Sequence, residues 1–130
     1  MYELNIEASF SAAHALQIAG AREPIHGHNW HVKATIRGAT LDHDGLVCDF
    51  HTVHEMMMEI ITPFHNNNLN EVAPFTKINP TAELIAKHIG DELSTSLNEP
   101  LSPHAYVHSV SVTEAVGCAA VYYPRGFPQD

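Results

Sequence analysis

Alternating apolar and polar residues predict that the chain opens with two long β-strands. Every second residue of the stretch 2–10 is apolar, and the strand pattern continues to His14. A period of two places the apolar side chains on one face of a strand. A second alternating stretch spans residues 26–40, and residues 15–25, which show no helical pattern, would connect the two strands as an irregular β-hairpin. The apolar face of the second strand would consist of Trp30, Val32, Ala34 and Ile36.

Apolar residues at a spacing of three and four predict two helices after this hairpin. The first would begin with Asp49 as its N-cap and end at Pro63. The second would begin at Asn79, as a capping residue, with Pro80 in its first turn, and would be broken by the segment 98–103. The two buried stripes would be Val53, Met56, Met57, Ile60 and Ile61, and then Leu84, Ile85, Ile89 and Leu93.

Two further strands complete the pattern, at residues 105–113 and 118–123, with Gly117 in the turn between them. A polar loop, residues 64–79, separates the two helices. The predicted order is β-β-α-α-β-β, which suits an α+β fold with a four-stranded antiparallel sheet and two helices on one face. The outer sheet edges would then be open, and open edges favour oligomerisation.

Composition narrows the class of protein. The 130 residues, 45% of them hydrophobic, predict a single domain, 1–130, with a real core. A formal charge of −9 argues against nucleic acid and anionic membranes as partners, and no apolar stretch approaches the roughly 20 residues of a membrane-spanning helix. Cys48 and Cys118 lie in apolar runs, which predicts core positions and a reducing, cytoplasmic setting.

Three histidines are candidates for a metal site. His26 and His28 are two residues apart on the second predicted strand, so both imidazoles would share a face, with Gly27 leaving the opposite face clear. His14, at the end of the first strand, would be brought across by strand pairing. Three imidazoles with a fourth position open are typical of catalytic zinc. Solvent-facing strand histidines are the alternative that the spacing leaves open, because the chain has eleven histidines.

Short motifs around these histidines occur in a characteristic order: Phe10-x-Ala12-Ala13-His14, His26-Gly27-His28, Val47-x-Asp49-Phe50, Pro80-Thr81-x-Glu83 and Val112-Thr113-Glu114. Together they resemble the 6-pyruvoyl-tetrahydropterin synthase and 6-carboxytetrahydropterin synthase family, from roughly Tyr2 to Tyr123. The resemblance implies the tunnelling fold (T-fold), in a hexamer built as a dimer of trimers with active sites between subunits. It also implies that His14, His26 and His28 bind Zn²⁺.

The resemblance gives Glu23 a catalytic role. Family synthases place a cysteine, as general base, shortly before the His-Gly-His motif, and the loop 15–25 has none. Glu23 resembles the glutamate of a variant subgroup, similar to enzymes that cleave the dihydroneopterin side chain to 6-hydroxymethyl-dihydropterin for folate synthesis. A carboxylate beside the metal suits such proton removal. The alternative is that Glu23 is a solvated loop acid.

Two further residues are implied to bind the pterin. Glu114 matches the glutamate that accepts two N–H bonds from the ring, an arrangement that would also give a partner to a costly buried charge. Thr81 resembles the segment that lines the pterin pocket from a neighbouring subunit. For Thr81 and Glu83 the alternative role is to stabilise the first turn of the helix, and Asp49 is expected to act as a cap first.

One segment departs from the family pattern. Family enzymes carry an Asp-His pair that relays protons, whereas this chain has His65-Asn66 before Leu69-Asn70. His65 remains a candidate catalytic residue, but with either alignment the carboxylate partner is missing. The standard synthase mechanism is therefore in question.

These observations predict a zinc-dependent lyase acting on the C6 side chain of 7,8-dihydroneopterin or its phosphate. The six bases are scattered, which favours a substrate with few phosphates over the triphosphate. One alternative is 6-carboxytetrahydropterin synthase, as in queuosine biosynthesis, or 6-pyruvoyltetrahydropterin synthase. The other is a pterin-binding homologue without turnover.

Overall fold

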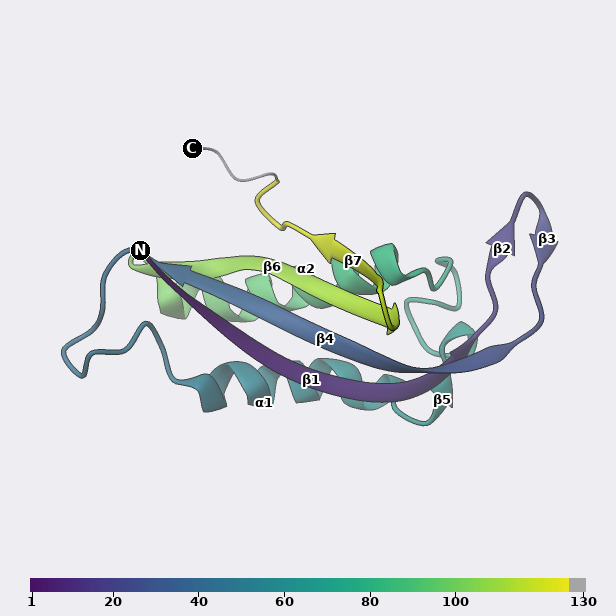
Figure 1. Cartoon of the computed structure of the whole chain (residues 1–130), viewed down its shortest axis with the longest axis horizontal. Coiled ribbons are helices and arrows are strands. Elements are labelled where there is room, and N and C mark those ends of the chain that lie inside the picture. The colour runs from purple at the N-terminus through teal and green to yellow at the C-terminus, as the bar shows by residue number, and fades with distance from the viewer. Residues whose placement is uncertain (127–130) are drawn as a thin grey trace.

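Two long antiparallel strands form the spine of the molecule. In the computed structural model, which describes residues 1–126, β1 (Tyr2–His14) lies beside β4 (His26–Gly38) along its whole length (Figure 1). The pairing runs from Tyr2 opposite Gly38 to His14 opposite His26. The predicted hairpin is thus confirmed, with His14 and His26 side by side at its end.

The sheet has five strands in the order β5-β1-β4-β6-β7. β6 (Ala105–Ala115) and β7 (Cys118–Tyr122) extend the antiparallel part beyond β4. The addition to the predicted four strands is β5 (Asn67–Asn68), which pairs in parallel with β1 inside the expected loop 64–79. The α+β fold is confirmed, with this short strand covering one end of the β1 edge.

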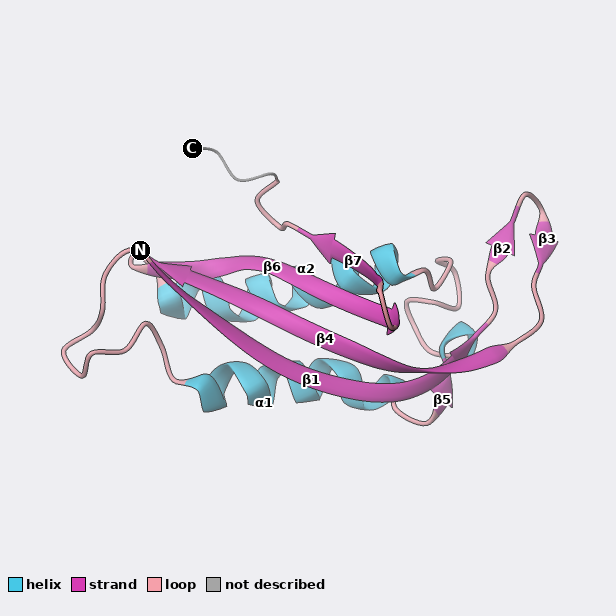
Figure 2. Ribbon diagram, in the orientation of Figure 1, coloured by secondary structure: helices cyan, strands magenta, loops and turns pink. Residues whose placement is uncertain are grey.

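Both helices, α1 (Phe50–Ile61) and α2 (Ala82–Leu101), cover the same face of the sheet (Figure 2). Short 3-10 turns follow α1 at Thr62–Phe64 and β5 at Leu69–Glu71. The core lies between the two layers. It includes all four apolar residues expected on the inner face of β4, namely Trp30, Val32, Ala34 and Ile36.

The helix ends differ partly from the sequence prediction. Asp49 caps α1 as expected, by accepting a hydrogen bond from the backbone N–H of His51. The predicted cap of α2 at Asn79 is wrong, because Thr81 caps it by accepting from Leu84 N–H. The helix also continues through Pro100 to Leu101. Proline is tolerated there because the chain leaves the helix at once, and its missing N–H removes only one bond from the last turn.

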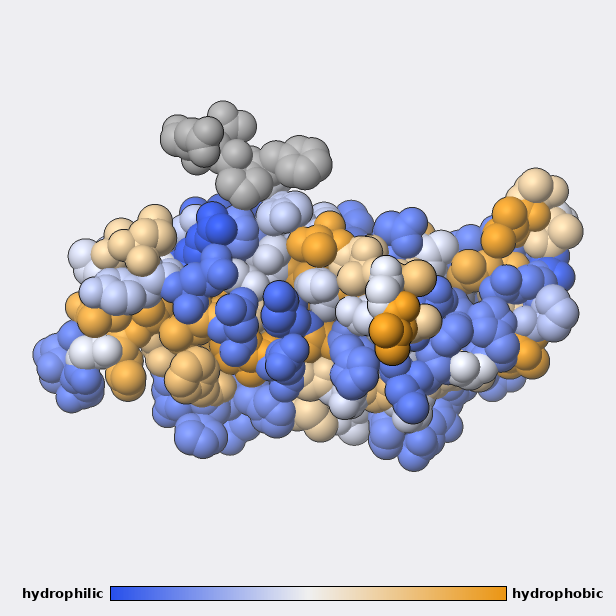
Figure 3. Space-filling model, in the orientation of Figure 1, coloured by the Kyte–Doolittle hydropathy of each residue, from blue (hydrophilic) through white to orange (hydrophobic). Residues whose placement is uncertain are grey.

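The connection between β1 and β4 contains a small two-stranded ribbon. Its strands, β2 (Gln17–Ile18) and β3 (Ala21–Arg22), project from the end of the sheet (Figure 1). The outer sheet face is mostly hydrophilic over β1 and β4 (Figure 3).

The expected core position of Cys118 is wrong, since it is exposed on the edge strand β7, whereas Cys48 is partly buried. Within residues 1–126, no helix is long and apolar enough to cross a membrane.

Candidate metal centre

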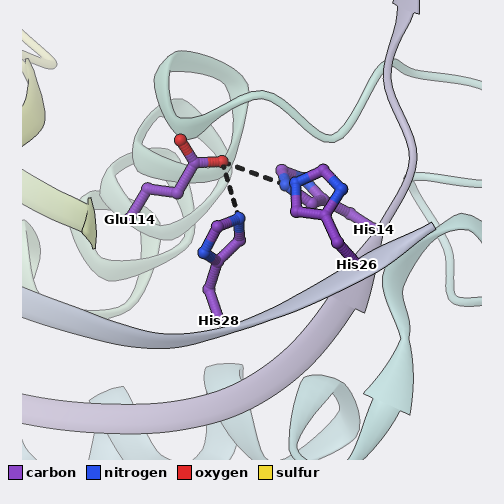
Figure 4. A group of neighbouring side chains, drawn as sticks. All are labelled: His14, His26, His28 and Glu114. Carbon is purple, nitrogen blue, oxygen red and sulfur yellow. Dashed lines mark ion pairs between the residues drawn. The ribbon is translucent and has the colours of Figure 1, made fainter. Parts of the chain in front are cut away.

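Four side chains converge where the ends of three strands meet. They are His14 from β1, His26 and His28 from β4, and Glu114 from β6 (Figure 4). One ligand atom from each lies within 4.8 Å of the ligand atoms of the others, so the group could hold a metal ion. The predicted three-histidine cluster is therefore assembled by the fold, and a carboxylate joins it.

Backbone carbonyls orient two of the imidazoles. Nδ1 of His14 lies 2.8 Å from the carbonyl oxygen of Pro80, and Nδ1 of His26 lies 3.0 Å from that of Pro24. Because a carbonyl only accepts, each Nδ1 must donate, and each Nε2 keeps its lone pair. A hydrogen bond of this kind to the second ring nitrogen is usual for metal-binding histidines.

The remaining ring nitrogens are well suited to a metal. His14 is completely buried, and Nε2 of His14 and Nε2 of His28 are buried and make no hydrogen bond within residues 1–126, although Oε1 of Glu114 is close to both. Buried nitrogens that make no hydrogen bond cost free energy, which a bound metal ion would recover. Burial also lowers the pKa of His28, and the two neighbouring histidines lower it further against the opposing effect of Glu114. The neutral imidazole is the form that binds a metal.

Glu23 lies at the rim of this cluster. Its backbone N–H donates to Leu16 C=O, and its Oε1 accepts from Leu16 N–H, both at 3.0 Å. These two bonds hold the carboxylate where the ribbon returns to β4, with Oε1 3.8 Å from Nδ1 of His26. The structure therefore brings the predicted general base next to the predicted metal ligands.

Glu114 faces the histidines rather than open solvent. Its Oε1 lies 3.0 Å from Nε2 of His14 and 3.5 Å from Nε2 of His28. A cavity of about 450 Å³ adjoins it, lined also by Glu83 and by residues of β7. The sequence analysis gave Glu114 a role in pterin binding only. It missed the proximity of Glu114 to the histidines, because that proximity depends on the pairing of β6 with β4.

The other two predicted site residues, Thr81 and His65, are not members of the four-residue cluster. The hydroxyl of Thr81 accepts a hydrogen bond from Leu84 N–H at 3.1 Å and so caps α2. His65 lies at the β1 edge, where its Nδ1 accepts from Ser11 N–H at 3.1 Å. Asn66, with φ of 60°, donates its N–H to Ser11 C=O. Within one chain His65 is therefore tied to β1 at Ser11 and is not part of the four-residue cluster.

Comparisons with known proteins agree with this fold. Residues 3–125 match the 6-pyruvoyl tetrahydropterin synthase family. The chain belongs to this family. Its members are lyases that act on dihydropterins, and the family is known for a metal ion. The predicted family membership is confirmed.

The individual relatives share less than a third of their residues with this chain over the aligned length. The Bacillus subtilis 6-carboxy-5,6,7,8-tetrahydropterin synthase is 29% identical over 125 residues, which cover 88% of this chain and 84% of the relative. The Caenorhabditis elegans 6-pyruvoyl tetrahydropterin synthase structure superposes with a TM-score of 0.81 at 22% identity, over 94% of each chain. The Plasmodium vivax enzyme gives 0.76 at 24% identity, over 93% of this chain and 96% of the other. These solved structures confirm the T-fold.

Proposed function

We propose that this family member is a zinc-dependent lyase that cleaves the C6 side chain of 7,8-dihydroneopterin or its phosphate. The best-supported reaction is a retro-aldol cleavage that gives 6-hydroxymethyl-dihydropterin. The observation that carries this proposal is the position of Glu23, a carboxylate held 3.8 Å from His26 in a connection that contains no cysteine. His14, His26 and His28 would hold the zinc.

Each group has a defined task in this reaction. When bound, the metal would polarise the side-chain hydroxyls of the substrate and lower their pKa. Glu23 accepts the proton of the hydroxyl on the second side-chain carbon. The bond between the first and second carbons then breaks, and its electron pair stays on the first carbon, which takes up a proton. The second and third carbons leave as an aldehyde.

The choice of glutamate as base has support from a relative. Solved structures of the Plasmodium vivax synthase include two in which a catalytic glutamate is replaced, by alanine in one and by cysteine in the other. In the present chain the Leu16 N–H bond fixes Oε1 of Glu23 at the rim of the cluster. A carboxylate that is positioned before the substrate arrives loses little entropy in the reaction.

Pterin recognition is proposed for Glu114 and Thr81. The cavity beside Glu114 has room for a ring, and a carboxylate can accept two parallel N–H bonds from the 2-amino and N3 positions. The Thr81 hydroxyl accepts from Leu84 N–H and keeps its own proton free to donate. Glu83, in the first turn of α2, supplies a second carboxylate to the same cavity.

The distribution of bases favours a substrate with few phosphates. Arg22 and Lys77 line a cavity of about 330 Å³ beside the ribbon that carries Glu23. Arg37 and Lys87 are instead engaged in ion pairs with acids. Two cations in one cavity suit a single phosphate better than a triphosphate in a chain of net charge −9.

The position of His65 connects the proposal to assembly. His65 is tied to β1 at Ser11 and lies outside the four-residue cluster, so we propose that it takes part in the reaction at a site shared with another copy of the chain. The proposed hexamer, a dimer of trimers, would provide such copies. Cytoplasmic location belongs to the same proposal, supported by free cysteines at positions 48 and 118.

A product assay tests the proposal. Zinc-loaded protein is incubated with 7,8-dihydroneopterin and, in parallel, with its triphosphate. We expect release of 6-hydroxymethyl-dihydropterin, reduced at least 100-fold in Glu23→Ala, as for loss of a general base (about 10²–10⁴-fold). Glu55→Ala, which removes an exposed acid of α1, serves as the matched control and should keep full activity.

Two other products of the assay would point to other functions. Formation of 6-carboxytetrahydropterin or 6-pyruvoyltetrahydropterin would make the protein a synthase with glutamate as its base, and the name of the Bacillus subtilis relative favours the carboxy form as the second candidate. Tight pterin binding without any product would identify a binding homologue, in line with the missing carboxylate partner of His65.

A further inference from the structure

Strand β7 is fastened to helix α2 at its last residue, Tyr122. The Tyr122 hydroxyl donates to Oδ1 of Asp91 at 2.6 Å, and Oδ2 of Asp91 accepts from Nζ of Lys87, also at 2.6 Å. The Lys87 ammonium lies 5.6 Å from the centre of the Tyr122 ring, within the range of a cation–π contact. The bond to Asp91 raises the pKa of Tyr122, so the phenol stays protonated and continues to donate. These contacts hold the end of the strand against the helix.

Gly90 allows the Tyr122 ring to come this close. A Cβ added at Gly90 would lie 2.7 Å from Cδ2 and 3.1 Å from Cε2 of Tyr122, well inside the contact distance of two carbons. Glycine in the middle of a helix is destabilising relative to alanine, yet Gly90 is buried well inside α2. The chain therefore keeps a weak helix former where the ring needs the space. The contact of Tyr122 with Gly90 and Asp91 is called the Tyr122 clamp below.

One step before the clamp, the same face of β7 carries only a methyl group. Alternation puts Ala120 and Tyr122 on the side that faces α2, and both are partly buried, whereas Ala119 and Val121 are exposed. Two strand residues span about 7 Å. The strand and the helix are thus in contact at Tyr122, and a short distance away Ala120 fills little of the space between them.

That space belongs to the cavity of about 450 Å³ that also borders Glu114. Ala82 and Glu83, from the first turn of α2, line the helix side, and Ala120 lines the strand side. The volume is within the usual range of ligand pockets, roughly 300–1,000 Å³. Seven residues, about 10 Å along the helix axis, separate Glu83 from Gly90. The clamp therefore lies beyond one end of the cavity, on the two elements that form its walls.

We propose that Ala120 determines which ring systems the cavity admits, and that the Tyr122 clamp is the positioning element that keeps β7 at the required distance from α2. The inference rests on the proposed function, which places the pterin in this cavity. A flat compound of two rings needs the space in which a larger side chain at position 120 would stand, and a compound of one ring needs less of it. Ala120 thus separates ligands by ring size, while Tyr122 acts only through the position of the strand.

Binding of two ring compounds tests the role of Ala120. Pterin has two rings and no C6 side chain to cleave, and isocytosine presents the same N–H groups on a single ring. Zinc-loaded wild type, Ala120→Leu and Ala119→Leu are titrated with each compound by calorimetry. We expect Ala120→Leu to weaken pterin binding at least about tenfold and isocytosine binding less than about threefold. Ala119→Leu, the matched change on the other face of β7, should leave both affinities within about twofold.

A second substitution tests the clamp. Gly90→Ala pushes the Tyr122 ring away from α2 and widens the gap, which should weaken pterin binding but leave room for a larger side chain on β7. The loss caused by Ala120→Leu should then be at least about threefold smaller in the Gly90→Ala background, because substitutions that share one gap are not additive. Asp91→Asn, which keeps an acceptor for the Tyr122 hydroxyl, should bind pterin nearly as the wild type does, whereas Asp91→Ala should bind it more weakly.

The outcomes separate the inference from the proposed function. An unchanged ratio of the two affinities in Ala120→Leu, folded by circular dichroism, would overturn the role of Ala120, and strictly additive losses would overturn that of the clamp. Ala120→Val, a smaller step, gives the same test if the leucine variant does not fold. Wild-type protein that binds neither compound would overturn the proposed function together with the inference.

Discussion

At the scale of single residues, His14 shows why the cluster is more than a set of surface histidines. It is completely buried, its Nδ1 is fixed by Pro80 C=O, and in the part of the chain that the structure describes its Nε2 makes no hydrogen bond and faces Glu114. A histidine kept only for packing would place both nitrogens in hydrogen bonds. The alternative of solvent-facing histidines is therefore excluded for His14, although His26 remains partly open to solvent.

Loss of one ligand should remove the metal. We expect His28→Ala to bind no stoichiometric zinc after dialysis, because two imidazoles and a carboxylate hold a metal far less tightly than the full set. The control is His31→Ala on the same strand, whose exposed ring belongs to the opposite face. Zinc content by atomic emission measures both. Full zinc retention in His28→Ala would show that the site lies elsewhere.

At the scale of elements, two asparagines act as strand partners for the segment that leaves β1. The Asn70 side chain accepts from Ala15 N–H at 2.8 Å and donates to Ala15 C=O at 2.9 Å. Asn79 does the same with Gln17, at 3.0 and 2.9 Å. Each side-chain amide thus reproduces the two bonds of a strand pair. Together they anchor the beginning of the connection that carries Glu23.

Removal of this anchor should loosen the connection. We expect Asn70→Ala to lower the free energy of unfolding by about 1–3 kcal/mol, since it leaves two backbone groups of the buried Ala15 unpaired. Urea unfolding gives the total, and amide hydrogen exchange at Ala15 reports the local effect. Asn67→Ala should cost much less, because the side chain of Asn67 bonds only the exposed backbone carbonyls of Pro63 and His65, which water can reach. Equal losses in the two variants would contradict this role.

At the scale of the whole molecule, the sheet has unequal edges. On one side β5 covers part of β1. On the other side β7 is the last strand of the sheet, with Cys118 and Val121 exposed. Edge strands with exposed aliphatic side chains pair readily with another chain. This edge also borders the Glu114 cavity, so an added strand would complete the wall of the proposed pterin pocket.

A charge on this edge should therefore disrupt the proposed hexamer. We expect Val121→Lys to shift the protein to smaller species in sedimentation velocity and to weaken pterin binding, because lysine on an edge strand opposes further pairing. The control is Val116→Lys in the preceding turn, where the side chain is already fully exposed. An unchanged sedimentation coefficient in Val121→Lys would place the interface elsewhere.

The sequence by itself determined the four long strands, the two helices and three of the four residues in the cluster. Alternation on β4 places His26, His28 and Trp30 on one face, because a period of two needs no knowledge of the partner strand, and the predicted hairpin brings His14 beside His26. The cap at Asp49 is equally local. The order and spacing of the motifs were enough to identify the family, because both can be read from the chain without its structure.

Only the tertiary structure decided the rest. Asn79 has the chemistry of a helix cap, but its amide is already bound to Gln17, so Thr81 caps α2 instead. Glu114 reaches the histidines through the pairing of β6 with β4, which lie some 80 residues apart in the chain. His65 is held by Ser11, 54 residues away in the chain. Such contacts depend on which strands meet, and local periodicity specifies a face but not a partner.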